Sequence, residues 1–575
     1  MASIDSTSPT GTFQITSDLE IPDEIREEGI RLYFQHFHNQ PYPLLMETNG
    51  SPQASVAEYP KLVLLPLLAV SLRISNHPLF PSKDALAEMC GTLTEAAWSL
   101  LAAQYANFDF DLAYFQALCL LAQVDFATGK PHRGQAQVAL GLRLAQTRDL
   151  LRKESPGSAE VHLSLAWRSV VWTLFMMDRI FSGGSVRSSC VPASSFRLFL
   201  MPCGPPNPQG LSASTDMTLP TSPGDMLRAG TLDVISLNIV LLDIWHASLM
   251  DMFEDSSSAL IPFWRHDSMH VAIEDRLMEF EMKAHSHRYM AVGSPRRVLN
   301  EPHLRPYFSA WVFMQILYSA IRCRLHHPFV LFMKTRQQHD QVPLTTLQKS
   351  HQDSMIHSNW VIRHIIETEE AGITTHDPFI AYLVALAASI QLEHTINDNP
   401  KVASAARRKY DKAHGYLQKT AKIWPSVGNI LRVLEEISIR LHSRHTISHV
   451  HGEYDGAIPQ KEISHVNVEQ EDLDLMAELF DYAALAIEQE RTSPVLSSAT
   501  RHSFQPPNMA SNILPETITS ASNDSAAVES RQNRSYPLTV PEPIDWPNED
   551  FDIFPDVTND WSFWAGHGPL TFQRG

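Results

Sequence analysis

The sequence predicts an all-α fold, with a large multi-helix domain and disordered N- and C-terminal segments. Apolar residues recur at three- and four-residue steps through most of residues 21–490, and no segment shows the alternation typical of a β-strand. Hydrophobic residues occupy 44% of the 575 positions, which is enough to bury a large core. These observations indicate helices packed against helices.

Residues 159–184 carry the most apolar helical pattern, and we expect them to form the central helix. Trp172 and Phe175 lie in this segment and are predicted to be buried. Asp178 and Arg179 interrupt the apolar surface near its end. Because a buried charge needs a partner, we interpret these two residues as a structural ion pair rather than a catalytic one.

Five helices are expected before the central helix. Pro66 either kinks the second of them or marks a later start. Gly129-Lys130-Pro131 is a short turn of the kind that joins two helices into a hairpin. The predicted segments are residues 25–37, 62–74, 84–106, 109–128 and 134–151.

The region after the central helix changes character. Residues 185–230 are rich in Pro, Gly, Ser and Thr, and we interpret them as a long loop. Helical spacing then resumes, and it ends with an amphipathic segment, 469–490, whose polar face is acidic. The other helices predicted here are residues 231–253, 268–289, 307–327, 354–370, 378–395, 401–423 and 427–442.

The same patterns divide the chain into five regions. Residues 491–540 are rich in Ser, Thr, Asn and Pro, a composition typical of disorder. The predicted regions are a disordered tail at 1–20, a helical domain at 21–455, an acidic amphipathic helix region at 456–490, a disordered linker at 491–540 and an acidic, aromatic tail at 541–575.

Charge and cysteine content argue against several classes of protein. The net charge is −19, which opposes binding to phosphate backbones. The five cysteines include no Cys-x2-Cys pair, so we expect free thiols in a reducing compartment. The N-terminus lacks the pattern of a signal peptide, and the longest apolar runs, 62–72 and 379–392, are too short to span a bilayer. We expect a soluble intracellular protein with no membrane partner.

Five sequence phrases occur in a fixed order between residues 21 and 440. They contain aromatic residues together with the short sequences Asp-Arg, His-His-Pro-Phe and Pro-Phe. The phrases are Leu32-Tyr33-Phe34 through His38 to Pro43-Leu44-Leu45, Trp172 through Ser182, Pro262-Phe263-Trp264, Leu317-Tyr318 through Phe329, and Pro378 through Tyr382. Together they resemble the middle homology region, also called the fungal-specific transcription factor domain, of fungal zinc-cluster transcription regulators.

This resemblance implies a fungal transcription regulator of RNA polymerase II genes, located in the nucleus and working with the transcription machinery. Members of the family usually carry an N-terminal six-cysteine zinc cluster that reads DNA. The first cysteine here is Cys90, inside the helical domain, so we expect no zinc cluster. DNA would then be reached only indirectly, through a DNA-binding relative that pairs with the helical domain. The alternative is an all-α enzyme or small-molecule-binding protein with its site in the helical core.

No catalytic, cofactor or metal residue is assigned. Gly-x-Ser-x-Gly, Walker-type and Gly-x-Gly-x-x-Gly motifs are absent from the sequence. The best metal candidate is the group His442, His445, His449 and His451, which we interpret as a polar loop at a helix end because no cysteine or acid has ligand spacing. We expect His326-His327 to mark a helix terminus.

The tail at 541–564 combines seven acidic residues with six aromatic ones and contains no Lys or Arg. Acidic charge keeps such a segment solvated while its aromatic side chains remain available to a partner. We interpret it as an activation segment, the alternative being a tail that packs on its own domain. The predicted partner-binding residues are Trp546, Phe551, Phe554, Trp561, Phe563 and Trp564.

Overall fold

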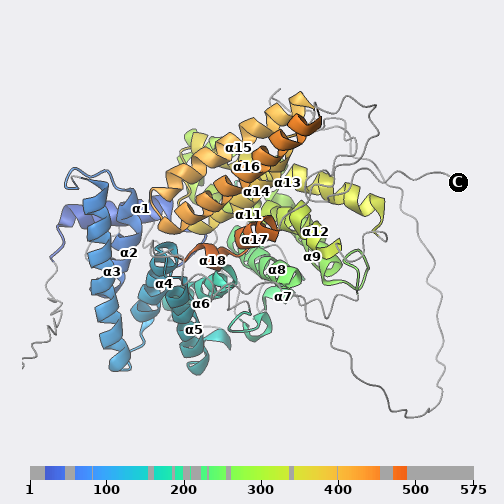
Figure 1. Cartoon of the computed structure of the whole chain (residues 1–575). Coiled ribbons are helices and arrows are strands. Elements are labelled where there is room, and N and C mark those ends of the chain that lie inside the picture. Colours follow the sequence, from blue (N-terminus) through green and yellow to red (C-terminus); the bar gives the residue numbers. More distant parts are fainter. Residues whose placement is uncertain are drawn as a thin grey trace, which may run out of the picture. The chain divides into compact units, whose positions relative to one another are not determined.

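The computed structural model contains α-helices and short 3-10 helices, and it has no β-strand among the residues that it describes (Figure 1). The predicted all-α fold is confirmed. The described elements belong to one compact unit, and the second unit, 489–555, lies outside the described residues. The structure describes residues 20–45, 59–80, 82–152, 161–183, 188–197, 207–208, 222–228, 232–253, 261–335, 342–397, 399–452 and 470–487.

The five helices expected before the central helix are all present, with bounds close to the predicted ones. Pro66 lies inside the second helix and is buried, so it does not mark a late start. Gly129 adopts a φ of 94° in the turn of the α4–α5 hairpin, a conformation that glycine takes without steric cost. The helices are α1 (Asp23–His36), α2 (Lys61–Ser71), α3 (Lys83–Ala106), α4 (Leu112–Ala127) and α5 (Pro131–Thr147).

The central helix is α6 (Val161–Phe181), which packs against α4, α5 and α8 (Val234–Phe253). Trp172 and Phe175 are fully buried, so their predicted burial is confirmed. Helix α8 is long and apolar enough to cross a membrane by length and composition alone, but 72% of its apolar window, Val234–Met252, is buried inside the protein. It contacts α6 and α11 and acts as a core helix.

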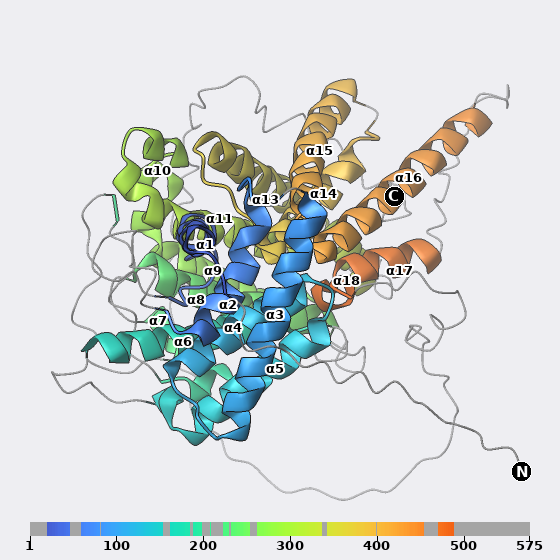
Figure 2. The ribbon, with the colours of Figure 1, turned by 90° about the vertical axis from the view of Figure 1, so that its left-hand side faces the viewer.

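Two later helices form the rest of the core: α11 (Arg305–Leu325) and α14 (Pro378–His394). Every residue of α14 except Glu393 is buried. Helix α11 contacts α8, α13 and α14, while α14 also contacts α15 and α16 (Figures 1 and 2). The surrounding helices are α9 (Met269–Lys283), α10 (Tyr289–Val292), α13 (Leu344–Glu370), α15 (Pro400–Ala421) and α16 (Pro425–Gly452).

The structure differs from the predicted elements in four helices, α7, α12, α13 and α16. Helix α12 (Pro328–Thr335) was not predicted, and α13 begins at Leu344 rather than at residue 354. A short helix α7 (Pro223–Met226) lies within the predicted loop. Helix α16 continues through Gly452, so the polar loop expected around His442 is wrong. The sequence holds no Pro or Gly between Gly428 and Gly452 that would end the helix earlier.

The acidic amphipathic region contains α17 (Gln470–Leu479) and α18 (Tyr482–Leu485). Between them, Phe480 is fully buried, and its carbonyl oxygen accepts a hydrogen bond of 3.0 Å from Arg324 of α11. Tyr482 is also buried, with its ring centroid 4.9 Å from those of Phe126 on α4 and Tyr382 on α14. This late segment therefore closes the core formed by helices far earlier in the sequence.

Candidate functional site

The predicted partner-binding residues lie outside the described residues. They are Trp546, Phe551, Phe554, Trp561, Phe563 and Trp564. Their role stays a prediction.

The Asp178–Arg179 pair lies buried at the end of α6. One guanidinium nitrogen of Arg179 contacts the Asp178 carboxylate, and the other donates to the carbonyl oxygen of Val191 at 3.0 Å. The amide of Cys190 donates to Asp178 at 3.0 Å. Burial raises the pKa of Asp178, and the contact with Arg179 opposes that rise. These contacts attach the segment after α6 to the helix, and the predicted structural ion pair is confirmed.

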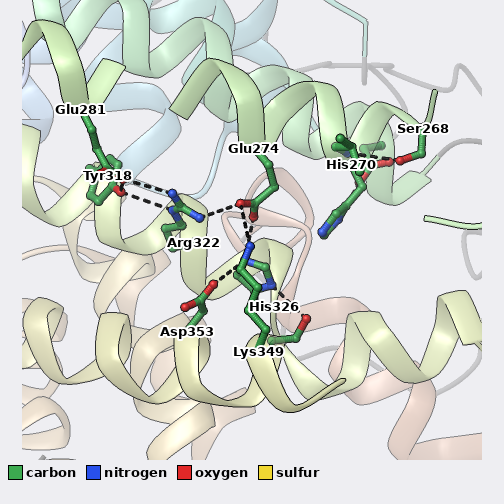
Figure 3. Close-up of polar contacts among 12 residues, drawn as sticks. Ser268, His270, Glu274, Glu281, Tyr318, Arg322, His326, Lys349 and Asp353 are labelled. Carbon is green, nitrogen blue, oxygen red and sulfur yellow. Dashed lines mark hydrogen bonds and ion pairs between the residues drawn. The ribbon is translucent and has the colours of Figure 1, made fainter. Parts of the chain in front are cut away.

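A second polar group joins α9, α11 and α13 (Figure 3). Its centre is Arg322 of α11, whose guanidinium donates to Glu274 at 2.7 Å and to Glu281 at 3.1 Å, both on α9. Tyr318, one turn before Arg322, donates its hydroxyl to Glu281. We call Glu274, Glu281, Tyr318, Arg322 and His326 the interhelical network.

His326 extends the interhelical network toward α13. Its Nε2 lies 2.7 Å from a Glu274 carboxylate oxygen and 3.5 Å from one of Asp353, and its Nδ1 lies 3.2 Å from the Ser350 hydroxyl. Lys349 approaches Glu274 at 3.9 Å. Figure 3 shows Glu274 between Arg322 on one side and the His326 and Lys349 side chains on the other. The network thus fixes three helices against one another.

The electrostatics of the network favour an ionised Glu274. Burial alone opposes ionisation, but the hydrogen bond with His326 and the positive charges of its neighbours outweigh burial and lower the pKa of Glu274 to about 2. Burial, with the positive charge of Lys334, holds the pKa of the nearby His270 well below its ordinary value. A neutral imidazole therefore lies beside a charged carboxylate.

Three residues of this region have the chemistry of metal ligands. His270, Glu274 and His326 are buried, and each offers one ligand atom within 4.8 Å of the others. Neutral imidazole and carboxylate suit zinc and similar ions. However, Arg322 and His326 already contact the Glu274 carboxylate, and Lys349 adds a further cation beside it. The arrangement is that of an interhelical ion-pair network.

Sequence reasoning placed His326 at a helix terminus, which is confirmed because α11 ends at Leu325 with His326 as its C-cap. It missed the network. The available signal was spacing: His270 and Glu274 are four residues apart on α9, and Tyr318, Arg322 and the C-cap His326 repeat every four residues along α11. Such spacing places polar groups on one helix face but does not reveal that the two faces meet.

Comparison with known proteins agrees with this helical architecture. Residues 30–257 match the model of the fungal specific transcription factor domain. The match runs from α1 into the segment after α8, so it covers the central helix and ends before the interhelical network. Residues 30–257 are therefore similar to a fungal specific transcription factor domain, and the resemblance inferred from the sequence phrases is confirmed.

Two curated relatives are regulators of transcription by name. An uncharacterized transcriptional regulatory protein of Schizosaccharomyces pombe is 22% identical over 464 residues, covering 75% of this chain and 54% of that protein. A Zn(2)-C6 fungal-type transcription factor of Fusarium oxysporum f. sp. lycopersici is 21% identical over 429 residues, covering 70% of this chain and 44% of that protein. The chain thus spans about half the length of these relatives. No solved structure matches it significantly.

Proposed function

We propose that this protein is a fungal transcription regulator that controls RNA polymerase II genes from the nucleus. The observation that carries the proposal is the match of residues 30–257 to the fungal specific transcription factor domain. Two relatives named as transcriptional regulators support it.

The tail is the proposed activation segment of this regulator. Residues 541–564 contain seven acidic and six aromatic residues and no Lys or Arg. The aromatic rings offer apolar contact area to a partner, and the acids steer the approach and keep the segment in water. Promoter recruitment is assigned to a partner protein, because the net charge of −19 disfavours direct approach to DNA.

The test is a reporter assay with the full chain fused to a heterologous DNA-binding domain in a fungal host. We expect the fusion to change reporter expression, and a fluorescent fusion of the full chain to accumulate in nuclei. A fusion that leaves the reporter unchanged in every growth condition would contradict the proposed function.

Variants of the same fusion test the tail. Replacing Trp546, Phe551, Phe554 and Trp561 with Ala should abolish activation, since the rings supply the partner contact. Replacing the tail acids with Asn or Gln should weaken activation less. The matched control is Phe504→Ala with Tyr536→Ala, which removes aromatic rings from the neighbouring 491–540 segment. Full activity after deletion of 541–575 would show that the tail is not the activation segment.

A further inference from the structure

A cavity of about 860 Å³ lies among α1, the 3-10 helix η1 (Leu72–Ile74), the start of α3 and the end of α15. These elements come from opposite ends of the helical domain. The cavity is distant in sequence from the interhelical network and shares no residue with it. We call it the basic cavity, because Lys and Arg outnumber acidic residues in its lining.

The lining of the basic cavity carries a strong excess of positive charge. Five of its residues are Lys or Arg and one is a carboxylate, Glu28. This excess occurs in a chain whose net charge is −19. Cations concentrated around a concave, partly apolar surface raise the local concentration of anions. The five cations are Arg31, Arg73, Lys83, Lys419 and Lys422.

Two of the five cations are neutralised within the protein. Arg31 pairs with Glu28 at 2.7 Å, and Lys419 pairs with Glu369 at 2.9 Å. Among the described residues, Arg73, Lys83 and Lys422 have no carboxylate within ion-pair distance. Three positive charges at one cavity are therefore left without a counterion from this part of the chain.

Arg73 is the best anchored of these three cations. Its Nε donates to the carbonyl oxygen of Ala69 at 3.1 Å, and its guanidinium lies 4.7 Å from the ring centroid of Trp424. Burial lowers the pKa of Arg73, the sign of a desolvated cation. A fixed guanidinium that keeps further N–H donors suits the two oxygens of a carboxylate or phosphate group.

Two histidines, His36 and His376, form part of the remaining walls. The Thr374 hydroxyl oxygen lies 2.8 Å from Nδ1 of His36 and 3.1 Å from Nε2 of His376. Burial lowers the pKa of both histidines to about 4. They are uncharged near neutral pH. Leu32, Ile74 and Ile423 add apolar surface. The basic cavity thus combines cations on some walls with imidazole and aliphatic groups on others.

We propose that the basic cavity binds a small anionic molecule bearing carboxylate or phosphate groups, held by Arg73, Lys83 and Lys422. The volume suits a small-molecule ligand. The anionic groups would pair with the three cations, and the rest of the molecule would contact the imidazole and aliphatic walls. Such a site adds ligand binding to the proposed role of the chain, and its test does not depend on transcription.

The test uses the purified full chain and four probes: citrate, inorganic phosphate, pyrophosphate and ATP. Isothermal titration calorimetry and thermal melting measure binding at low salt and at about 150 mM salt, where long-range charge effects are screened. We expect at least one probe to bind and to raise the melting temperature. Citrate tests whether the cavity binds carboxylate groups, and phosphate, pyrophosphate and ATP test whether it binds phosphate groups.

The cavity variant is Lys83→Gln with Lys422→Gln. Both lysines are exposed, so this double variant should fold normally. The matched control is Lys401→Gln with Lys412→Gln, which removes the same charge from exposed positions of α15 outside the cavity. We expect the cavity variant to weaken probe binding about tenfold or more and the control to leave it unchanged.

Arg73→Gln should weaken binding further, and circular dichroism will show whether that variant keeps its fold. Three outcomes would overturn the proposal: no binding of any probe, equal loss in the cavity and control variants, or binding unchanged in the cavity variant. A reporter assay that fails would leave these binding results standing, so the two proposals fail separately.

Discussion

The interhelical network and the basic cavity both gather charged residues from distant segments, but they differ in how those charges are neutralised. In the network, Arg322 contacts two carboxylates, and Glu274 contacts Arg322 and His326. In the cavity, five cations face one carboxylate. Charges paired inside packed helices hold a fold together, whereas unpaired charges beside a cavity indicate a ligand.

A large effect is expected in the apolar core, and it gives a reference for the effects expected in the two charged regions. Trp172→Ala and Phe175→Ala should each lower the free energy of unfolding by about 3–5 kcal/mol, since both side chains are fully buried. Denaturant unfolding of the full chain measures this. An exposed aromatic on another helix, Tyr105→Ala, is the control. Variants that are soluble and melt normally would show that α6 is not the packing centre.

The network should respond strongly when only one partner is removed. Arg322→Ala leaves Glu274 and Glu281 partly buried without their guanidinium, and we expect a loss of about 3–5 kcal/mol in the free energy of unfolding. The double variant Arg322→Met with Glu274→Leu removes the charges together and should cost less than Arg322→Ala. A double variant as damaging as the sum of the single ones would contradict a coupled ion pair.

The network also predicts a pH dependence. The pKa of Glu274 is lowered from an ordinary value of 4.5 to about 2, so its contribution to stability is present above about pH 4.5 and is lost as the pH falls toward 2. The stability difference between the natural chain and Glu274→Gln should therefore shrink over that window. Urea unfolding at a series of pH values measures it, with exposed Glu88→Gln as control. A stability difference that stays the same across this pH range would show that Glu274 does not stabilise the protein through its charge.

The smallest effect is expected on DNA. The cations of α15 outside the cavity are mostly exposed, and the net charge of −19 opposes approach to a phosphate backbone. The pure chain should give no sequence-specific footprint on promoter DNA at about 150 mM salt, although small anions bind the cavity. Footprinting beside a calorimetric titration compares the two directly. A defined footprint that persists at this salt concentration would show that the exposed cations bind DNA, which would contradict this prediction.

Helix positions were largely readable from the sequence because apolar spacing and helix-ending residues are local signals. The bounds of α3 and α14 agree with the predicted segments to within one residue, since Ser82 and Asp377 cap them. Prediction was weaker where local signals compete. The helix end at His326-His327 was predicted, but nothing local showed that Pro328 begins a new helix, α12, at whose first position proline is tolerated.

The sequence by itself determined the all-α class, the family resemblance and the buried centre at α6, because each rests on residues close together in the chain. Only the tertiary structure decided which polar faces meet. Arg322 reaches Glu274 from another helix, and Lys83 and Lys422 line one cavity although more than 300 positions separate them. The reason is physical: helical periodicity specifies which side of a helix is polar, while packing of the apolar faces determines which polar sides are brought together.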